Sequence, residues 1–139
     1  MKALHALALC AATVLGASAL ASDTWAIPPS SATPAAMQQM VLPSHGSNLL
    51  GVLYLAAGAG PHPTAVIFHG FPGFEQNLDI AQTLRAHGWN VLAMHYRGSW
   101  GVKGSFSFEH AAEDADTQVQ FLLDPANTQK YRIDPHRIV

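Results

Sequence analysis

Residues 69–73, with the sequence HGFPG, are the first candidates for chemistry in this chain. They directly follow residues 64–68, a short continuous apolar run that is typical of a strand buried on both faces of a parallel sheet. Ligands of open α/β sheets bind at the carboxyl ends of such strands. A sharp glycine-flanked turn there lets backbone N–H groups point into a cleft, where they could stabilise an oxyanion. The alternative is an ordinary turn between a strand and a helix.

A second candidate loop, YRGSWG, follows another apolar run at residues 90–94. Because it also begins at the carboxyl end of a predicted strand, we expect Tyr96, Arg97 and Ser99 to line the same cleft as His69. The alternative for Arg97 is structural: its guanidinium would brace the loop by hydrogen bonding to carbonyl groups or to a helix carboxylate. Glycines within this loop predict a turn with unusual backbone angles.

Metal binding and cofactor binding are not expected. The chain has eight His and one Cys, and no two His show the i, i+4 spacing of a helical zinc motif. His69 and His95 stand beside predicted strand ends, where we expect them to shape loops. One Cys also excludes a disulfide scaffold.

The elements that must position these loops follow from the hydrophobic pattern. Two β-like runs, joined by a loop at residues 43–47, predict a hairpin. The later elements are strands and helices in alternation, which predicts crossover connections and a mostly parallel sheet. Their expected ranges are 37–42, 48–55, 64–68 and 90–94 for strands, and 77–87 and 108–123 for helices.

The second predicted helix carries two further expectations. Ser107 is a plausible N-cap, and one apolar stripe should face inward at positions 108, 112, 115, 119 and 122. Pro125 predicts the end of this helix. Residues 131–136 then read as a connector, and residues 137–139 begin another apolar run.

The first 21 residues have the layout of a secretory signal peptide. Lys2 precedes an uncharged run rich in Ala and Leu, and residues 19–21 supply small residues for cleavage. An uncleaved membrane anchor is the alternative. Residues 22–37, rich in Pro, Ser and Ala, predict a linker, and residues 38–139 a single domain. We therefore expect a secreted or periplasmic protein with no membrane association after cleavage.

Composition limits the partners. The net charge is −2 and the chain has no basic stripe, so a nucleic-acid partner is not expected. The hydrophobic share of 49% favours a folded chain over a disordered one.

The three segments HGFPG, YRGS and DPHRIV, in this order and spacing, resemble the α/β-hydrolase fold family, most of all serine hydrolases akin to prolyl oligopeptidase and dienelactone hydrolase. The resemblance covers about residues 38–139. It implies an N-terminal part of an α/β-hydrolase sheet, and hydrolysis of a small-molecule or peptide acyl substrate without a cofactor. It also implies that the loop after the third strand supplies an oxyanion donor from the backbone of Phe71, with Gly70 beside it.

The sequence departs from this family at the nucleophile. The family places its Ser in a G-x-S-x-G elbow just after strand five, and no Ser in this chain has that setting. We expect the chain to be truncated before the elbow, without the catalytic Ser, acid and His, and to be inactive by itself. The alternatives are a non-catalytic secreted α/β binding module, with a ligand or partner strand at its open edge, and an inactive remnant.

Overall fold

The computed structural model describes residues 32–71 and 76–139, so the predicted signal peptide lies outside the described residues. The first strand begins at Ala36 and pairs with Leu55, so the last two residues assigned to the linker belong to the sheet. None of the helices in the described parts has the length and apolar character that crossing a bilayer requires.

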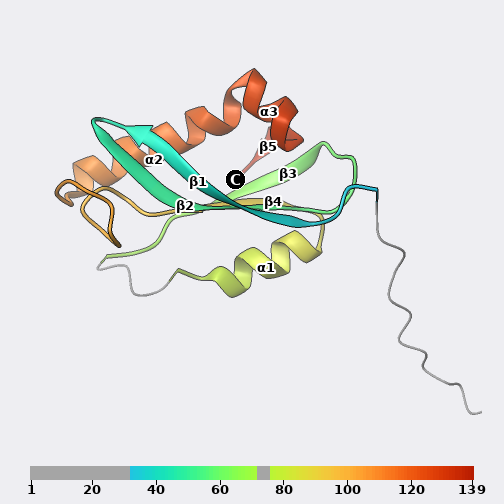
Figure 1. Ribbon diagram of the computed structural model, residues 1–139, viewed down its shortest axis with the longest axis horizontal. Coiled ribbons are helices and arrows are strands. Elements are labelled where there is room, and N and C mark those ends of the chain that lie inside the picture. The colour runs from blue at the N-terminus through green and yellow to red at the C-terminus, as the bar shows by residue number, and fades with distance from the viewer. Residues whose placement is uncertain (1–31, 72–75) are drawn as a thin grey trace, which may run out of the picture.

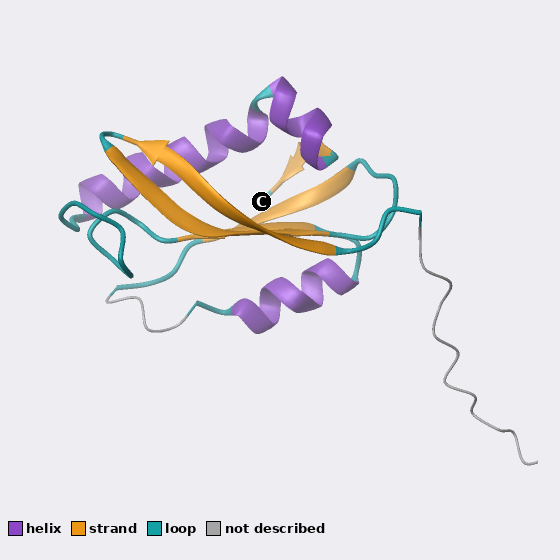
Figure 2. Ribbon diagram, viewed as in Figure 1, coloured by secondary structure: helices purple, strands orange, loops and turns teal. Residues whose placement is uncertain are grey.

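One five-stranded sheet carries helices on both faces (Figures 1 and 2). The strands are β1 (Ala36–Ser44), β2 (Ser47–Leu55), β3 (His62–Ile67), β4 (Asn90–Met94) and β5 (Ile133–Ile138). The helices are α1 (Leu78–Ala86) on one face and α2 (Phe108–Leu123) with α3 (Pro125–Tyr131) on the other. The strand order is β1-β2-β4-β3-β5. β3 is parallel to both of its neighbours, and β1 and β2 form an antiparallel hairpin, as expected.

The hairpin turn is tighter than the loop predicted at residues 43–47. Only His45 and Gly46 connect the two strands, because Pro43 pairs with Asn48 and Ser44 pairs with Ser47. Both turn residues have positive φ, 43° and 81°, the conformation that matches the natural twist of a two-residue hairpin. Proline is tolerated within β1 because β1 is an edge strand.

Most of the central elements match their predicted ranges closely, although β3 begins two residues earlier and ends one residue earlier than the range 64–68. β4 and α2 have the predicted bounds, and α1 is one residue shorter at each end than the range 77–87. The side chain of Ser107 accepts a hydrogen bond from the backbone N–H of His110 at 3.0 Å, which confirms the predicted N-cap.

α2, however, turns a different face to the sheet than its apolar stripe predicts. The fully buried residues of the helix are Asp114, Gln118 and Leu122, and Phe108 is 80% exposed. Of the predicted stripe, only position 122 is fully buried. A carboxylate can occupy the buried face because Arg97 lies against it and compensates its charge.

The predicted connector at residues 131–136 is instead the end of α3 and most of β5. Pro125 follows the end of α2 as expected, but it also begins α3, where its missing N–H costs nothing. The Asp124 carboxylate caps this helix by accepting the backbone N–H groups of Ala126 and Asn127 at 2.8 and 3.2 Å.

The two faces of the sheet are packed by alternating strand residues. In β4, Leu92 and Met94 belong to the core under α2 and α3, whereas Val91 belongs to the core under α1. The larger core consists of Met40, Leu42, Leu49, Leu53, Leu55, Leu92, Met94, Val102, Leu122, Tyr131 and Ile133.

Buried polar side chains join the elements at the amino end of β3 and β4. The Asn90 side chain accepts the backbone N–H of Ala56 at 3.0 Å and donates to the carbonyl of Tyr131 at 2.9 Å. Arg132 donates to the carbonyl of Ala56 at 3.1 Å, and the His62 ring contacts the carbonyl of Gly88 at 3.0 Å. These hydrogen bonds therefore hold together the segments at the amino ends of the parallel strands.

Candidate active site

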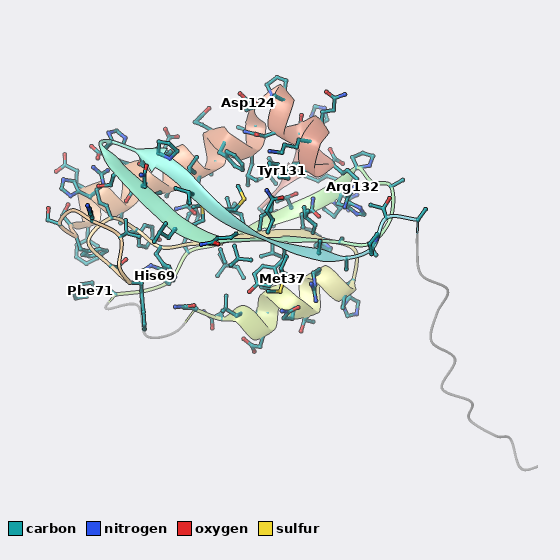
Figure 3. The ribbon with its side chains drawn as sticks, viewed as in Figure 1. Met37, His69, Phe71, Asp124, Tyr131 and Arg132 are labelled. Carbon is teal, nitrogen blue, oxygen red and sulfur yellow. The ribbon has the colours of Figure 1, made fainter. Side chains whose placement is uncertain are left out.

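Two loops meet at the carboxyl ends of β3 and β4. Ile67 and Ala93 are paired in these parallel strands, so the segments that follow them leave the sheet at the same edge. The first loop carries His69 and Phe71, which lie close together at one end of the molecule (Figure 3). The predicted juxtaposition of the two loops is therefore present in the fold.

The two loops enclose a cleft of about 400 Å³. The first loop contributes three lining residues and the second contributes four. In chain order they are His69, Gly70, Phe71, Gly98, Ser99, Trp100 and Phe106. This volume is within the range of small-molecule sites in proteins.

Gly98 sets the shape of the second loop. Its φ is 78°, and a Cβ atom here would overlap the backbone of Ser105 and Phe106. Only glycine allows this close approach, which brings Phe106 back over the start of the loop. Val102 closes the turn by accepting the backbone N–H of Gly98 at 3.2 Å and donating its own to Ser99 at 3.0 Å.

The first loop has two backbone N–H groups that can donate hydrogen bonds to a ligand. Among the described residues, no acceptor is hydrogen-bonded to the backbone N–H of Gly70 or Phe71. Both residues line the cleft. Unpaired backbone N–H groups beside a cavity are suited to hold a negatively charged oxygen atom.

Beneath the cleft, rings of the two loops pack against one another. His69 lies 4.6 Å from Tyr96 and 5.5 Å from His95, measured between ring centroids. The His69 Nε2 and His95 Nδ1 atoms are buried, and within the described parts of the chain neither has a hydrogen-bond partner. Burial, with a smaller contribution from His69, lowers the pKa of His95 below its ordinary value.

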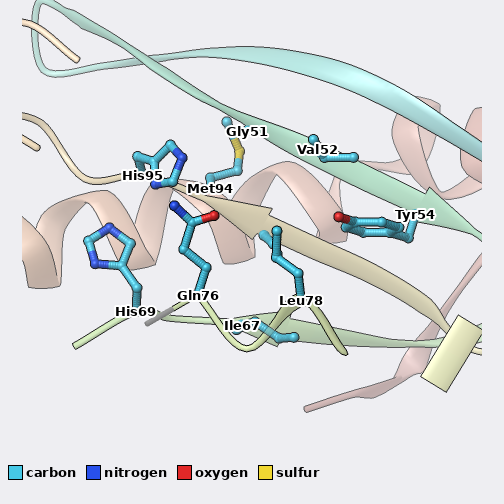
Figure 4. Close-up of a pocket in the computed structure, with 10 residues that line it drawn as sticks. Gly51, Val52, Tyr54, Ile67, His69, Gln76, Leu78, Met94 and His95 are labelled. Atoms are coloured by element: carbon cyan, nitrogen blue, oxygen red, sulfur yellow. The ribbon is translucent and has the colours of Figure 1, made fainter. Parts of the chain in front are cut away.

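A smaller pocket of about 50 Å³ lies between the sheet and the start of α1 (Figure 4). Figure 4 shows His69, Gln76 and His95 at one end of it and Tyr54 at the other. The rest of its lining is largely apolar, from β2, β3, β4 and Leu78. The pocket has room for a few water molecules or a very small ligand.

Tyr96 and Arg97, both expected to line the cleft, lie outside its lining. Tyr96 is buried between His69 and Phe106, at 4.6 and 6.2 Å between ring centroids. Burial and then the charge of Asp114 raise the pKa of the Tyr96 hydroxyl.

Arg97 points away from the cleft and toward α2. Its Nε donates to Asp114 at 3.1 Å, and its Nη2 donates to Glu113 and to the carbonyl of His110. The expectation of a pocket-lining Arg97 is thus corrected to the bracing role, because two helix carboxylates compete successfully for the guanidinium. Arg97 remains only 7% exposed.

The cleft also contains residues that the sequence analysis did not single out. Trp100 and Phe106 form part of its wall together with Gly98. The available signal was the clustering of aromatic residues in and after a glycine-rich loop, since large apolar side chains gathered at a surface often mark a binding site. His69, Gly70, Phe71 and Ser99 do lie on the cleft. The described residues contain no group of three or more His, Cys, Asp or Glu side chains that could hold a metal ion.

Comparison with protein-family models gives no match, and comparison with curated protein sequences gives none. Solved structures are similar. An α/β hydrolase, GrgF from Penicillium sp. sh18, is 20% identical, with a TM-score of 0.61 over 74% of this chain and 36% of its own. The carboxylesterase EstE1 from a metagenomic library is 22% identical, with a TM-score of 0.58 over 77% of this chain and 36% of its own.

The esterase Pf2001 from Pyrococcus furiosus is 17% identical, with a TM-score of 0.55 over 68% of this chain and 39% of its own. This chain therefore spans between a third and two fifths of the length of these three structures. At these identities, the likeness establishes a shared fold.

Proposed function

We propose, on the premise that this chain has the α/β-hydrolase fold, that it is the oxyanion-hole part of a serine hydrolase acting on ester or amide bonds. The observation that carries the proposal is the pair of backbone N–H groups at Gly70 and Phe71, which have no acceptor among the described residues and lie beside the cleft at the carboxyl end of β3. In this fold, one oxyanion donor comes from the loop after the third strand.

The nucleophile in this proposal lies outside the 139 residues, because no Ser here occupies a G-x-S-x-G elbow. Ser99 reaches the cleft, but its hydroxyl donates to the carbonyl of Tyr96 at 2.8 Å, and no acid–base partner for it is present in the described residues. The substrate's reacting carbonyl would sit over Phe71, with its oxygen accepting the backbone N–H as negative charge develops.

The test compares the 139-residue chain with a chain extended by the residues encoded downstream. Both are assayed on p-nitrophenyl esters and labelled with a fluorophosphonate probe. The extended chain is expected to turn over ester and to label on a Ser beyond Val139. Turnover by the short chain with a labelled Ser would overturn the proposal.

The donor itself is tested in the extended chain at Phe71. Phe71→Pro removes the backbone N–H, whereas Phe71→Ala keeps it and removes only the ring. Loss of one oxyanion donor is expected to lower kcat about 10²- to 10³-fold in the proline variant relative to the alanine variant. Equal kcat values in the two variants would exclude the Phe71 N–H as a donor.

A second candidate is a non-catalytic binding module, favoured by the surface beside β5. A groove of about 370 Å³ runs along this edge, between α2 and the strands, and is largely apolar. Its lining residues are Val66, Phe68, Val119, Leu123, Pro135, His136, Ile138 and Val139. A soluble 139-residue monomer that melts cooperatively, paired with an extended chain that no serine probe labels, would favour the module.

We also propose export for the whole protein, supported by the signal-like pattern of residues 1–21. Expression of the full chain in a bacterial host, followed by mass analysis of the periplasmic fraction, is expected to give a product beginning at Ser22. A product that keeps Met1 and stays with the membrane would instead indicate the anchor.

A further inference from the structure

The wall of the cleft is aromatic and uncharged. Phe71, Trp100 and Phe106 supply rings from two different loops, and the seven lining residues include no Asp, Glu, Lys or Arg. The charged side chain nearest in sequence, Arg97, is turned toward Asp114 and Glu113. A charged group entering this cleft would lose water without forming an ion pair with a lining side chain of Asp, Glu, Lys or Arg, and an anion could accept hydrogen bonds from backbone groups such as the N–H of Gly70 and Phe71.

Aromatic rings in and beside the cleft wall pack against one another. Phe71 stacks on Phe106 with centroids 4.7 Å apart and an interplanar angle of 26°. Phe108 lies 5.9 Å from Phe106 at 73°, an edge-on arrangement. These distances are those of favourable aromatic pairs, which support Phe71 and Phe106 in the wall of the cleft; Phe108 packs against Phe106 but does not line the cleft.

These rings are nevertheless poorly covered. Phe71 is 67% exposed and Trp100 is 48% exposed, while Phe106 is partly buried, with the Tyr96 ring 6.2 Å away between centroids. Large apolar side chains gathered at a concave surface mark a binding site more often than an accident of packing. An entering flat group would cover ring area that the fold leaves in water.

We propose that this cleft binds a neutral aromatic group, so that the substrate is an aryl-bearing ester or amide. The identification of the substrate as an ester or amide rests on the proposed function, whereas the aromatic preference rests on the wall alone. A planar ring can stack on Phe71 or Phe106 at the same spacing at which these two stack on each other. A saturated ring of equal size cannot approach as closely and has no quadrupole to match.

The test is a binding titration of the 139-residue chain, which needs no nucleophile. Trp25→Phe and Trp89→Phe leave Trp100 as the reporter, since the chain has three Trp. The probes are ethyl cinnamate and its fully saturated counterpart ethyl cyclohexanepropanoate. Ethyl cinnamate is expected to quench Trp100 fluorescence with a Kd at least tenfold below that of the saturated ester.

Two variants locate the site. Phe71→Leu and Phe106→Leu are each expected to raise the Kd for ethyl cinnamate about tenfold. Ile80→Leu is the control: Ile80 is an apolar residue of α1 that is 49% exposed and lines neither the cleft nor the groove beside β5, so its substitution should leave the Kd unchanged. Because Phe71 is largely exposed, its variant should fold even if Phe106→Leu does not, as a circular-dichroism melt would show.

Equal Kd values for the aromatic and saturated esters, or an equal effect of Ile80→Leu, would overturn the inference. Hydrolysis by the extended chain separates it from the proposed function. Ester turnover with no aromatic preference in kcat/KM would overturn the inference and support the proposed function. Selective quenching by ethyl cinnamate, together with an extended chain that hydrolyses nothing, would support the inference and overturn the proposed function.

Discussion

The carboxylate of Asp114 accepts hydrogen bonds from both the backbone N–H and the side-chain Nε–H of Arg97, at 2.8 and 3.1 Å. The same carboxylate accepts the hydroxyl of Ser44 at 2.6 Å. One fully buried side chain on α2 therefore fixes the end of β1 and the base of the loop that carries Trp100. The position of half the cleft depends on this contact.

Removal of the Asp114 carboxylate should lower the free energy of unfolding. In Asp114→Ala, Arg97 stays buried with Glu113 as its remaining carboxylate partner among the described residues. Breaking a buried pair completely costs about 3–5 kcal/mol, so with one partner left we expect a loss of about 3 kcal/mol. Urea unfolding should show this loss of unfolding free energy. Asp116→Ala, an exposed acidic position on the same helix, should leave stability nearly unchanged. Similar losses in the two variants would mean that the buried pair contributes little.

The two glycines on the cleft should respond differently to alanine. Gly98→Ala forces a Cβ into the backbone of Ser105 and Phe106 at a positive φ, and such strain costs at least about 1–3 kcal/mol. Gly70→Ala meets no heavy atom within 4 Å. Thermal melts should therefore show a lower Tm for Gly98→Ala alone. An equal fall in both would contradict this account of the loop.

Asn90 should matter more than its size suggests. Asn90→Ala leaves the N–H of Ala56 and the carbonyl of Tyr131 without their partners in a fully buried place. Each unsatisfied group costs about 1–3 kcal/mol, so the unfolding free energy should fall by at least one such amount. Asn48→Ala, at an exposed position of the hairpin, is the control and should be close to neutral.

His95 should make stability fall in mild acid. Burial lowers its pKa in the folded chain below the ordinary value of 6.5, so the unfolded chain takes up the proton first as the pH falls. The contribution is present in full above the ordinary pKa and is lost as the pH falls through the lowered pKa. Unfolding free energies measured from about pH 8 to pH 5 should decline less steeply in His95→Gln. An unchanged slope would show that other groups set the acid response.

Much of the scaffold could be predicted because its signals are local. The bounds of β4 and α2 follow from a short apolar run and from a cap residue, Ser107, that acts within three residues of itself. The side-by-side placement of the two loops follows from the parallel arrangement of the strands that precede them. Neither inference requires information on which side chains far apart in the sequence are in contact.

The differences arise where distant residues decide the outcome. The buried face of α2 contains Asp114 because Arg97, 17 residues earlier, compensates it, and no helical periodicity reveals such a partner. Phe106 reaches the cleft because Gly98 folds the loop back through a positive φ. Pro125 is compatible both with the end of one helix and with the start of another. A second helix begins here because the Asp124 side chain caps it.

The two ends of the parallel strands differ in how they can change over evolution. At the amino ends, Asn90, His62 and Arg132 tie neighbouring segments together, so an insertion there would break several bonds at once. At the carboxyl ends, the base of the second loop is joined to β1 through Asp114 and Ser44, whereas the described wall residues of the first loop form no side-chain hydrogen bond to another strand. Exchanging or lengthening those walls would alter what fits between them while the register of the sheet stays intact, which makes this rim the place where relatives can diverge.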